Sequence, residues 1–251
     1  MSFPNIILFG DSLTEQGFNY AQHGFVASLS SDYVRRADVL NRGLSGYNST
    51  WLLPFLEEVL AAQTAPVLLW TLWVGANDAC LPSYVFNVPL PTYKQNLSQM
   101  ISMIRSHEPS KDAKILIITP PPIDKKMLFV HHRRQGKDRD PKVTECYAEA
   151  AREVAKETGS GLLDYFKMLD SAAREEAGTV EGDEVTLEGW ATDGLHLAGK
   201  GYELLYEEFT KYVTENWPEI SASKIPLVKP WVGDLEVVKE WAESKAMESE
   251  V

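Results

Sequence analysis

The residues from Val67 to Val74 form an almost unbroken apolar run, with Pro66 before it and Gly75 after it. The run is far too short to cross a membrane, and it has no polar face to turn towards water. It is therefore typical of a central strand in a parallel sheet that is covered on both faces. A shorter run, Ile6 to Phe9, also ends at a glycine. Together the two runs predict a chain folded around a buried parallel sheet.

Three further segments have the apolar, turn-bounded character of strands: residues 37–41, 114–119 and 161–164. Between the strands, apolar side chains recur at helical spacing, as in Leu97, Met100 and Ile104. Strands that alternate with amphipathic helices favour a parallel sheet with helices on both sides. We expect a three-layer α/β/α sandwich with a central, mostly parallel, five-stranded sheet, formed by residues 1–217.

The chain changes character from residue 218 onward. Two X-Pro pairs, Ile225-Pro226 and Lys229-Pro230, predict an extended strap. Leu235, Val238 and Trp241 then have the spacing of a short amphipathic helix. The apolar face of that helix needs a cover, either the chain's own domain or a partner subunit. Residues 218–251 are therefore expected to pack on the domain or to join two subunits in a homodimer.

Composition excludes several classes of function. The 251 residues carry a formal net charge of −12, with a pI of about 4.9. Nucleic acids and anionic membranes both attract basic surfaces, so neither is an expected partner. Two cysteines, Cys80 and Cys146, lack metal-ligand spacing and are expected to be free thiols. No secretory signal or membrane span is visible, which predicts a cytoplasmic protein.

Polar residues follow three of the predicted strands. Asp11 and Ser12 come directly after the first strand, Gly43 follows the second, and Asn77 follows the third. The carboxyl ends of parallel strands share one edge of the sheet, where such folds bind ligands. Ser12 is therefore a candidate nucleophile. A structural alternative is open, because Ser12-x-x-Glu15 has the form of a helix capping box. Ser45 is the rival serine.

A serine nucleophile needs a general base, and the chain has five histidines. His196 follows Asp193 by three residues within a glycine-containing turn, a spacing that can set a carboxylate against one imidazole nitrogen. His23 and His107 are expected to be solvated or capping residues. The pair His131 and His132 has no partner at metal-ligand spacing, so we expect neither a metal nor a cofactor.

Four motifs, in this order, resemble the blocks of the GDSL, or SGNH, hydrolase superfamily: Gly10-Asp11-Ser12-Leu13, Gly43, Gly75-x-Asn77-Asp78 and Asp193-x-x-His196. They cover the chain from residue 5 to about residue 215. Other stretches resemble the isoamyl acetate-hydrolysing esterases, among them Arg42 to Asn48 and Thr119 to Pro122. The G-x-S-x-G elbow of α/β-hydrolases is absent.

The resemblance implies a role for each matching residue. Ser12 would attack an ester carbonyl, His196 would act as general base and Asp193 would orient it. The Ser12 and Gly43 backbone N–H groups and the Asn77 amide would form the oxyanion hole, and Asp11 would be a structural partner in the turn.

The implied activity is hydrolysis of small carboxylic esters, such as acetates, through an acyl-enzyme. Alternatives on the same fold are a carbohydrate acetylesterase and a lysophospholipase or thioesterase. A non-catalytic binding module is disfavoured because all four blocks are intact. Phosphoryl transfer from Asp11 is disfavoured because Leu13 stands where a further carboxylate would help to hold Mg²⁺.

Two features are candidates to shape the site for a small-molecule ester. The segment 124–139 is rich in cations within an acidic protein, and is expected to be either a substrate-lining lid or a solvated loop. Its cations are Lys125, Lys126, Arg133, Arg134, Lys137 and Arg139. Trp190, Tyr84, Val85 and Phe86 are candidates to line an acyl or alcohol pocket, although aromatic side chains also commonly fill cores.

Overall fold

The computed structural model describes residues 3–132, 135–180 and 184–248. Its centre is a five-stranded sheet in the order β2-β1-β3-β4-β5, and every neighbouring pair is parallel. The strands are β1 (Asn5–Gly10), β2 (Asp38–Gly43), β3 (Val67–Trp73), β4 (Lys114–Ile118) and β5 (Gly161–Leu163). The predicted strands are thus all present, with shifts of one or two residues at their ends.

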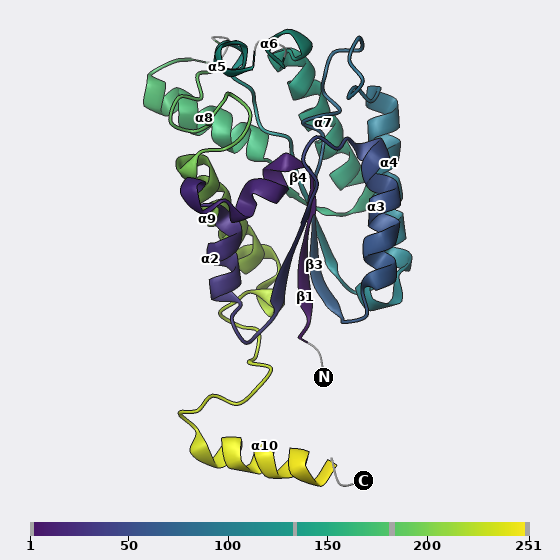
Figure 1. Cartoon of the computed structure of the whole chain (residues 1–251), viewed down its shortest axis with the longest axis vertical. Coiled ribbons are helices and arrows are strands. Elements are labelled where there is room, and N and C mark those ends of the chain that lie inside the picture. The colour runs from purple at the N-terminus through teal and green to yellow at the C-terminus, as the bar shows by residue number, and fades with distance from the viewer. Residues whose placement is uncertain (1–2, 133–134, 181–183, 249–251) are drawn as a thin grey trace.

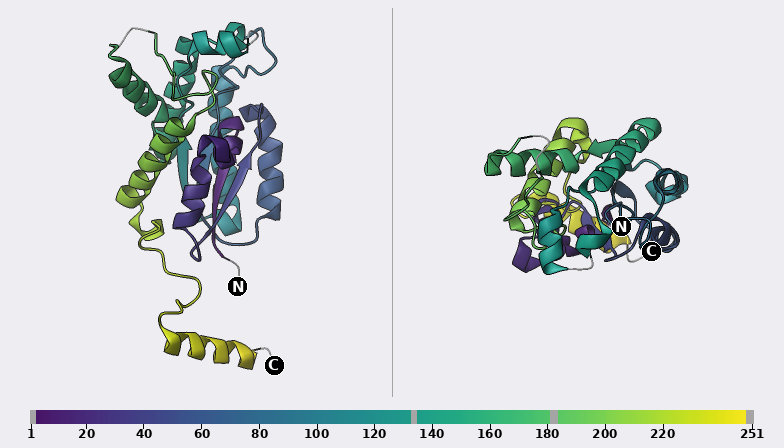
Figure 2. Two further views of the ribbon diagram at one scale, coloured as in Figure 1. Left: turned by 60° about the vertical axis from the view of Figure 1, so that its left-hand side comes forward. Right: turned by 90° about the horizontal axis from the view of Figure 1, so that it is seen from above.

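Helices cover both faces of the sheet (Figure 1). One face is covered by α2 (Phe25–Asp32), α8 (Tyr165–Ala177) and α9 (Gly199–Asn216). The opposite face is covered by α3 (Ser49–Ala62), α4 (Leu90–Ser106) and α7 (Pro141–Thr158). The prediction of a three-layer α/β/α sandwich is confirmed. The view from above in Figure 2 shows the same layers along the strands.

Both faces of strand β3 are buried, which explains why the run 67–74 is apolar almost throughout. Successive side chains of a strand point to opposite faces, so Leu69 and Trp73 enter one core while Trp70 and Leu72 enter the other. The two tryptophan rings are fully buried, and their indole N–H groups find acceptors in Ser110 Oγ and the Thr119 carbonyl. These donors are therefore satisfied within an otherwise apolar interior.

Short helices cluster at the carboxyl edge of the sheet. They are α1 (Ser12–Glu15), α5 (Lys125–His131) and α6 (Gln135–Asp138), with the 3₁₀ turns η1 (Gln16–Phe18) and η2 (Tyr20–Gln22). The strand order changes direction between β1 and β3, and this is the point where doubly wound sheets bind ligands. The turns after β1, β2 and β3 meet at this edge.

Two local features differ from the expectations based on the sequence. The charged segment 124–139 is not an irregular loop, because it contains α5 and α6; its Arg133 and Arg134 lie outside the described residues. Helix α8 was not predicted at all, although its start is marked by Asp164, whose side chain accepts the Lys167 N–H as an N-cap.

The C-terminal segment has two parts. The strap includes η4 (Pro218–Ile220) and lies along the body, with Ile220 and Ile225 buried. Helix α10 (Leu235–Glu248) lies apart from the body in both views (Figures 1 and 2), so in this structure it does not pack on the domain. Within the described ranges, no helix combines the length and the apolar character that a membrane crossing requires.

Candidate active site

Ser12 is the first residue of α1, directly after β1. Asp11, not Ser12, caps this helix, since its Oδ1 accepts the Leu13 N–H at 3.0 Å. Glu15 does not reach back to Ser12 either, because its carboxylate accepts the N–H and the hydroxyl of Ser45, each at 2.7 Å. The capping-box interpretation is therefore wrong. The Ser12 hydroxyl is left for another partner.

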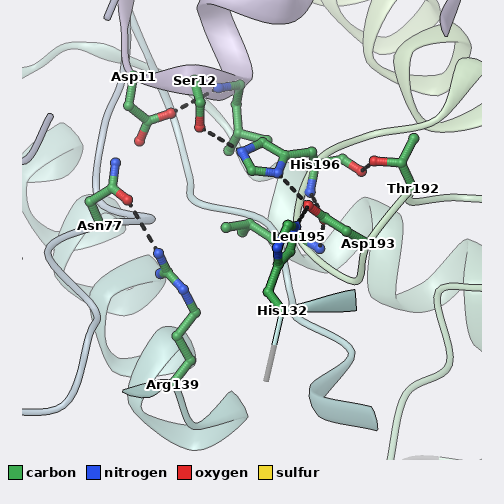
Figure 3. Close-up of polar contacts among 10 residues, drawn as sticks. Asp11, Ser12, Asn77, His132, Arg139, Thr192, Asp193, Leu195 and His196 are labelled. Atoms are coloured by element: carbon green, nitrogen blue, oxygen red, sulfur yellow. Dashed lines mark hydrogen bonds and ion pairs between the residues drawn. The ribbon is translucent and has the colours of Figure 1, made fainter. Parts of the chain in front are cut away.

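That partner is His196, as Figure 3 shows. Ser12 Oγ lies 2.9 Å from His196 Nε2, and His196 Nδ1 lies 2.7 Å from Asp193 Oδ2. A nitrogen that faces a carboxylate carries the proton, so Nδ1 donates to Asp193 and Nε2 is left to accept from the serine hydroxyl. The structure thus brings Ser12 to His196, 184 positions later in the sequence, and to its neighbour Asp193, in the arrangement of a serine–histidine–aspartate triad.

The Asp193 carboxylate is fixed by the turn that contains it. Its Oδ1 accepts the N–H groups of Leu195 and His196, at 3.0 and 2.8 Å. Burial alone would raise the pKa of Asp193, but the hydrogen bonds and charge of His196, together with these N–H groups, hold it well below its usual range. Asp193 therefore stays ionised and able to stabilise a positive imidazole.

The start of helix α5 is hydrogen-bonded to the turn that contains Asp193. The Asp124 N–H donates to the Gly194 carbonyl at 2.9 Å, and Asp124 Oδ2 accepts the Leu187 N–H at 3.0 Å. Just after α5, His132 Nε2 lies 3.1 Å from Asp193 Oδ2, so this carboxylate oxygen faces two imidazoles. Sequence reasoning considered His132 only as a metal ligand. No spacing signal connects a histidine to an aspartate 61 residues away.

The three proposed oxyanion donors differ in their surroundings. The Ser12 N–H opens α1, where first-turn N–H groups have no acceptor within the helix. The Gly43 N–H instead donates to the Asn41 side-chain oxygen at 2.9 Å, a local bond that the sequence analysis missed. Asn77 Nδ2 donates to the Tyr47 carbonyl at 2.9 Å, and Asn77 Oδ1 accepts from Arg139 Nη2 at 3.2 Å.

Two buried carboxyls lie beside these donors. Burial raises the pKa of Asp11 to about 6 and that of Asp78 to about 7. Asp78 accepts the Ser49 N–H with both oxygens, at 3.0 and 3.1 Å, and so joins the end of the β3 turn to the start of α3. Asp11 Oδ2 has no hydrogen-bond partner among the described atoms.

The candidate pocket residues differ in their burial and in their contacts. Trp190 is only 7% exposed and belongs to a core cluster, with Lys200 Nζ 4.1 Å from its ring centroid; its role as a pocket residue stays a prediction. Tyr84 is partly buried and Val85 projects into solvent. Phe86 packs on Trp51, which packs in turn on Tyr47, with ring centroids 5.8 and 6.2 Å apart. We call Tyr47, Trp51 and Phe86 the aromatic shelf.

The remaining histidines and cysteines singled out in the sequence have other surroundings. His23 is exposed, and His107 Nδ1 lies 3.1 Å from Ser110 Oγ. Cys80 is buried, Cys146 is exposed and neither is in a disulfide. In the part of the chain that the structure describes, no three His, Cys, Asp or Glu side chains gather as metal ligands. A cavity of about 980 Å³ lies between α5, α7 and α8, but Ser12 and His196 do not line it.

Residues 8–204 match the model of the GDSL-like lipase/acylhydrolase family. Among curated proteins, the chain is 32% identical over 242 residues to the isoamyl acetate-hydrolyzing esterase 1 homolog of Bos taurus, covering 93% of this chain and 88% of the relative. It is 31% identical to the isoamyl acetate-hydrolyzing esterase of Saccharomyces cerevisiae, covering 87% of this chain and 90% of that protein.

Solved structures show the same fold. A lipase/acylhydrolase from Enterococcus faecalis superposes with a TM-score of 0.62 at 24% identity, covering 91% of this chain and all of that one. An acetylxylan esterase from Geobacillus stearothermophilus superposes with a TM-score of 0.61 at 19% identity, covering 84% of this chain and 94% of that one. At these identities the two structures are evidence for the fold alone.

Proposed function

The chain belongs to the GDSL-like lipase/acylhydrolase family and is a carboxylic-ester hydrolase, and from this premise we propose that it cleaves small, uncharged esters through an acyl-enzyme formed on Ser12. The observation that carries the proposal is the continuous path from Ser12 Oγ to His196 Nε2 at 2.9 Å and from His196 Nδ1 to Asp193 Oδ2 at 2.7 Å. This path supplies a nucleophile, its base and the group that orients the base.

In the first half-reaction, Ser12 Oγ bonds to the ester carbonyl carbon while its proton passes to His196 Nε2. The tetrahedral intermediate then collapses, and the alcohol leaves with the proton that His196 returns. In the second half-reaction, His196 takes a proton from water as the water oxygen bonds to the acyl carbon. The acyl–serine bond then breaks, His196 returns the proton to Ser12 Oγ, and the acid is released. Asp193 keeps its negative charge throughout and stabilises the imidazolium that forms twice in each cycle.

The negative charge on the carbonyl oxygen needs donors that are already in place. We propose the Ser12 N–H and the Asn77 amide as these donors, each typically worth about 2.7–4 kcal/mol in the transition state. The Gly43 N–H joins them only if it releases the Asn41 oxygen that it now contacts. In this chain the Asn77 amide therefore carries a larger share of oxyanion stabilisation than in a hole with three free donors.

The substrate class follows from the surroundings of these donors. The aromatic shelf begins at Tyr47, whose carbonyl accepts directly from Asn77, and its Trp51 ring is 37% exposed. An exposed apolar surface so close to the oxyanion donors favours an alkyl group on the ester. Acetates and other short acyl esters of aliphatic alcohols are the proposed substrates. The relatives named for isoamyl acetate hydrolysis agree with this class.

The decisive experiment is replacement of the nucleophile. Ser12→Ala is expected to lower kcat on isoamyl acetate by about 10⁴- to 10⁶-fold, because knockouts of a nucleophilic serine have effects of this size. A fluorophosphonate should label wild-type Ser12, as a mass shift on the peptide that contains it. Ser45→Ala is the matched control and should keep its activity and its labelling. Rapid ester turnover by folded Ser12→Ala protein would exclude the proposed mechanism.

A further inference from the structure

Arg139 is a buried cation beside the oxyanion donors. It follows α6, only 4% of its side chain is exposed, and its guanidinium is surrounded by the loop that follows β3. Burying a charge is costly unless hydrogen bonds and opposite charges compensate it. Here Nη1 donates to the Ala76 carbonyl, Nη2 donates to Asn77 Oδ1 at 3.2 Å, and Nε lies 3.9 Å from Asp138 Oδ1.

The backbone fixes Arg139 in this place. The Leu81 N–H donates to the Asp138 carbonyl at 2.7 Å, and Cys80 and Arg139 form an isolated antiparallel bridge. The segment that carries the guanidinium is thus attached to the same short loop, residues 76–81, that carries Asn77. Because both ends of the contact are held by main-chain bonds, the guanidinium approaches the amide in a defined direction.

The Asn77 amide can serve an oxyanion in only one of its two orientations. With Oδ1 held by Arg139 and Nδ2 bonded to the Tyr47 carbonyl, one N–H of Nδ2 remains for a substrate. In Figure 3 the nitrogen end of this amide points towards Asp11 and Ser12, and the oxygen end towards Arg139. A flipped amide would present its oxygen to the developing negative charge and repel it.

We propose that Arg139 is a positioning residue of the oxyanion hole, which locks the Asn77 amide with its N–H towards the substrate and polarises it. This inference rests on the proposed function, because it assigns Asn77 as an oxyanion donor. A cation on the amide oxygen draws electron density from the nitrogen and so strengthens its N–H as a donor. The occupied Gly43 N–H makes the chain more dependent on this one amide.

A guanidinium suits this role better than an ammonium. Its planar fork reaches the Ala76 carbonyl and the Asn77 oxygen at once, whereas a lysine at 139 presents a single point charge at the end of a flexible stem. An ionised Asp11 would repel an oxyanion, and the positive charge of Arg139 partly offsets this repulsion. Arg139→Lys should therefore still orient the Asn77 amide in part, and Arg139→Met should not orient it at all.

The test compares binding of the transition state with binding of the ground state. Arg139→Met is expected to lower kcat on isoamyl acetate by about 10- to 100-fold with little change in KM, since the loss is felt only as charge develops on the oxygen. Arg139→Lys should lose less than Arg139→Met. Arg152→Gln is the matched control, because it removes a partly buried arginine whose ion-pair partners are Asp164 and Glu149, and it should leave kcat unchanged.

A short-chain trifluoromethyl ketone gives a second readout. Ser12 Oγ adds to its carbonyl carbon, the serine proton passes to His196 Nε2, and the ketone oxygen becomes the oxyanion. The affinity for this ketone should fall by the same factor as kcat in the Arg139 variants, while the affinity for 3-methylbutanol, a product with no oxyanion, stays constant. A role in folding alone would not separate the two ligands.

A double-mutant cycle decides whether Arg139 acts through Asn77. In an Asn77→Ala background, Arg139→Met should lower kcat by less than about threefold, because there is no amide left to orient. An equal loss in both backgrounds, or a wild-type kcat in folded Arg139→Met protein, would overturn the inference. If Arg139→Met does not fold, Arg139→Lys is measured against the same two criteria.

The outcomes also separate this inference from the proposed function. Wild-type turnover in Ser12→Ala and Asn77→Ala would remove the proposed mechanism itself. Loss of activity in those two variants with full activity in the Arg139 variants would leave the mechanism in place and remove only the role of Arg139.

Discussion

Ionisation of the buried Asp11 and Asp78 carboxyls lowers the stability of the folded chain. Both are held in a medium that disfavours their ionised form, and the resulting pKa values, about 6 and 7, lie well above the ordinary aspartate value of 3.8. Between those pH values and pH 3.8, the folded chain binds more protons than the unfolded chain. Each carboxyl therefore lowers the free energy of unfolding as the pH rises through this window.

Asp78→Asn tests this sign. The amide oxygen can still accept the Ser49 N–H, and the cost of ionisation disappears. Relative to wild type, Asp78→Asn should melt higher at a pH of about 8 than at a pH of about 5, since each unit of pKa shift is worth about 1.4 kcal/mol before relaxation. The exposed Asp112→Asn should show no such dependence. Equal differences in Tm at the two pH values would contradict this explanation.

The two imidazoles on Asp193 should differ in importance. His196 Nδ1 lies 2.7 Å from Oδ2 and must carry positive charge during the reaction, whereas His132 Nε2 lies 3.1 Å from the same oxygen and is largely exposed. Asp193→Asn should lower kcat by about 10³- to 10⁴-fold through loss of charge and tautomer control. His132→Ala should change kcat by less than about threefold, since a single hydrogen bond from a half-exposed side chain contributes little, and His196 still holds the same oxygen. A large loss in His132→Ala would make it part of the catalytic apparatus.

The contact between α1 and the end of β2 holds the nucleophile against the sheet. A side chain on Gly43 would place its Cβ 2.1 Å from the Glu15 backbone nitrogen, so this approach requires glycine. Gly43→Ala should destabilise the fold by about 1–3 kcal/mol or more, because a backbone atom cannot move aside as a side chain can. Gly199→Ala, whose Cβ would have the exposed His23 side chain as its nearest neighbour at 3.3 Å, is the control and should lower Tm less. Thermal unfolding of the two variants makes the comparison.

The aromatic shelf joins α3 to the loop before α4, and it should select for the alkyl part of the substrate. Trp51→Ala is expected to lower kcat/KM on isoamyl acetate about tenfold more than on ethyl acetate, since each buried methylene is worth about 0.8 kcal/mol. Trp241→Ala removes a similarly exposed ring from the C-terminal helix, 36% exposed against 37% for Trp51, and serves as control. An equal loss on both esters would mean that the shelf supports structure and does not set specificity.

Local sequence patterns predicted the elements that position the triad, but they could not predict contacts between residues that are far apart in the sequence. An apolar run ending in Gly10-Asp11-Ser12 and the turn Asp193-x-x-His196 are short-range signals, and the parallel sheet brings the strand ends to one edge. Arg139 was assigned to a charged lid or solvated loop because its partners, Ala76 and Asn77, lie 63 and 62 residues earlier. No periodicity connects such positions, and a run of cations ordinarily indicates a solvated surface.

At the scale of the whole molecule, the sequence predicts that the hydrolase domain ends before residue 218, but the residues that follow are hydrogen-bonded to that domain. Tyr33 Oη donates to the Ile220 carbonyl at 2.8 Å, the Val228 N–H donates to the Arg35 carbonyl at 2.9 Å, and the Arg36 guanidinium contacts the Ile225 carbonyl. We therefore propose that the folded unit extends to Pro230. Beyond it, α10 lies apart, with Leu235 and Trp241 exposed (Figure 1).

Two truncations separate the strap from the helix. A chain ending at Pro230 should keep the Tm and the kcat/KM of the full chain, because every buried strap residue remains. A chain ending at Trp217 loses Ile220 and Ile225, and should be destabilised by about 3–6 kcal/mol, at about 1.5–3 kcal/mol for each buried side chain. Equal Tm values for the two truncated chains would contradict the proposed boundary. The full chain and the chain ending at Pro230 also test whether the exposed apolar face of α10 joins two subunits. Light scattering should then give twice the chain mass for residues 1–251 and a single chain mass for the chain ending at Pro230.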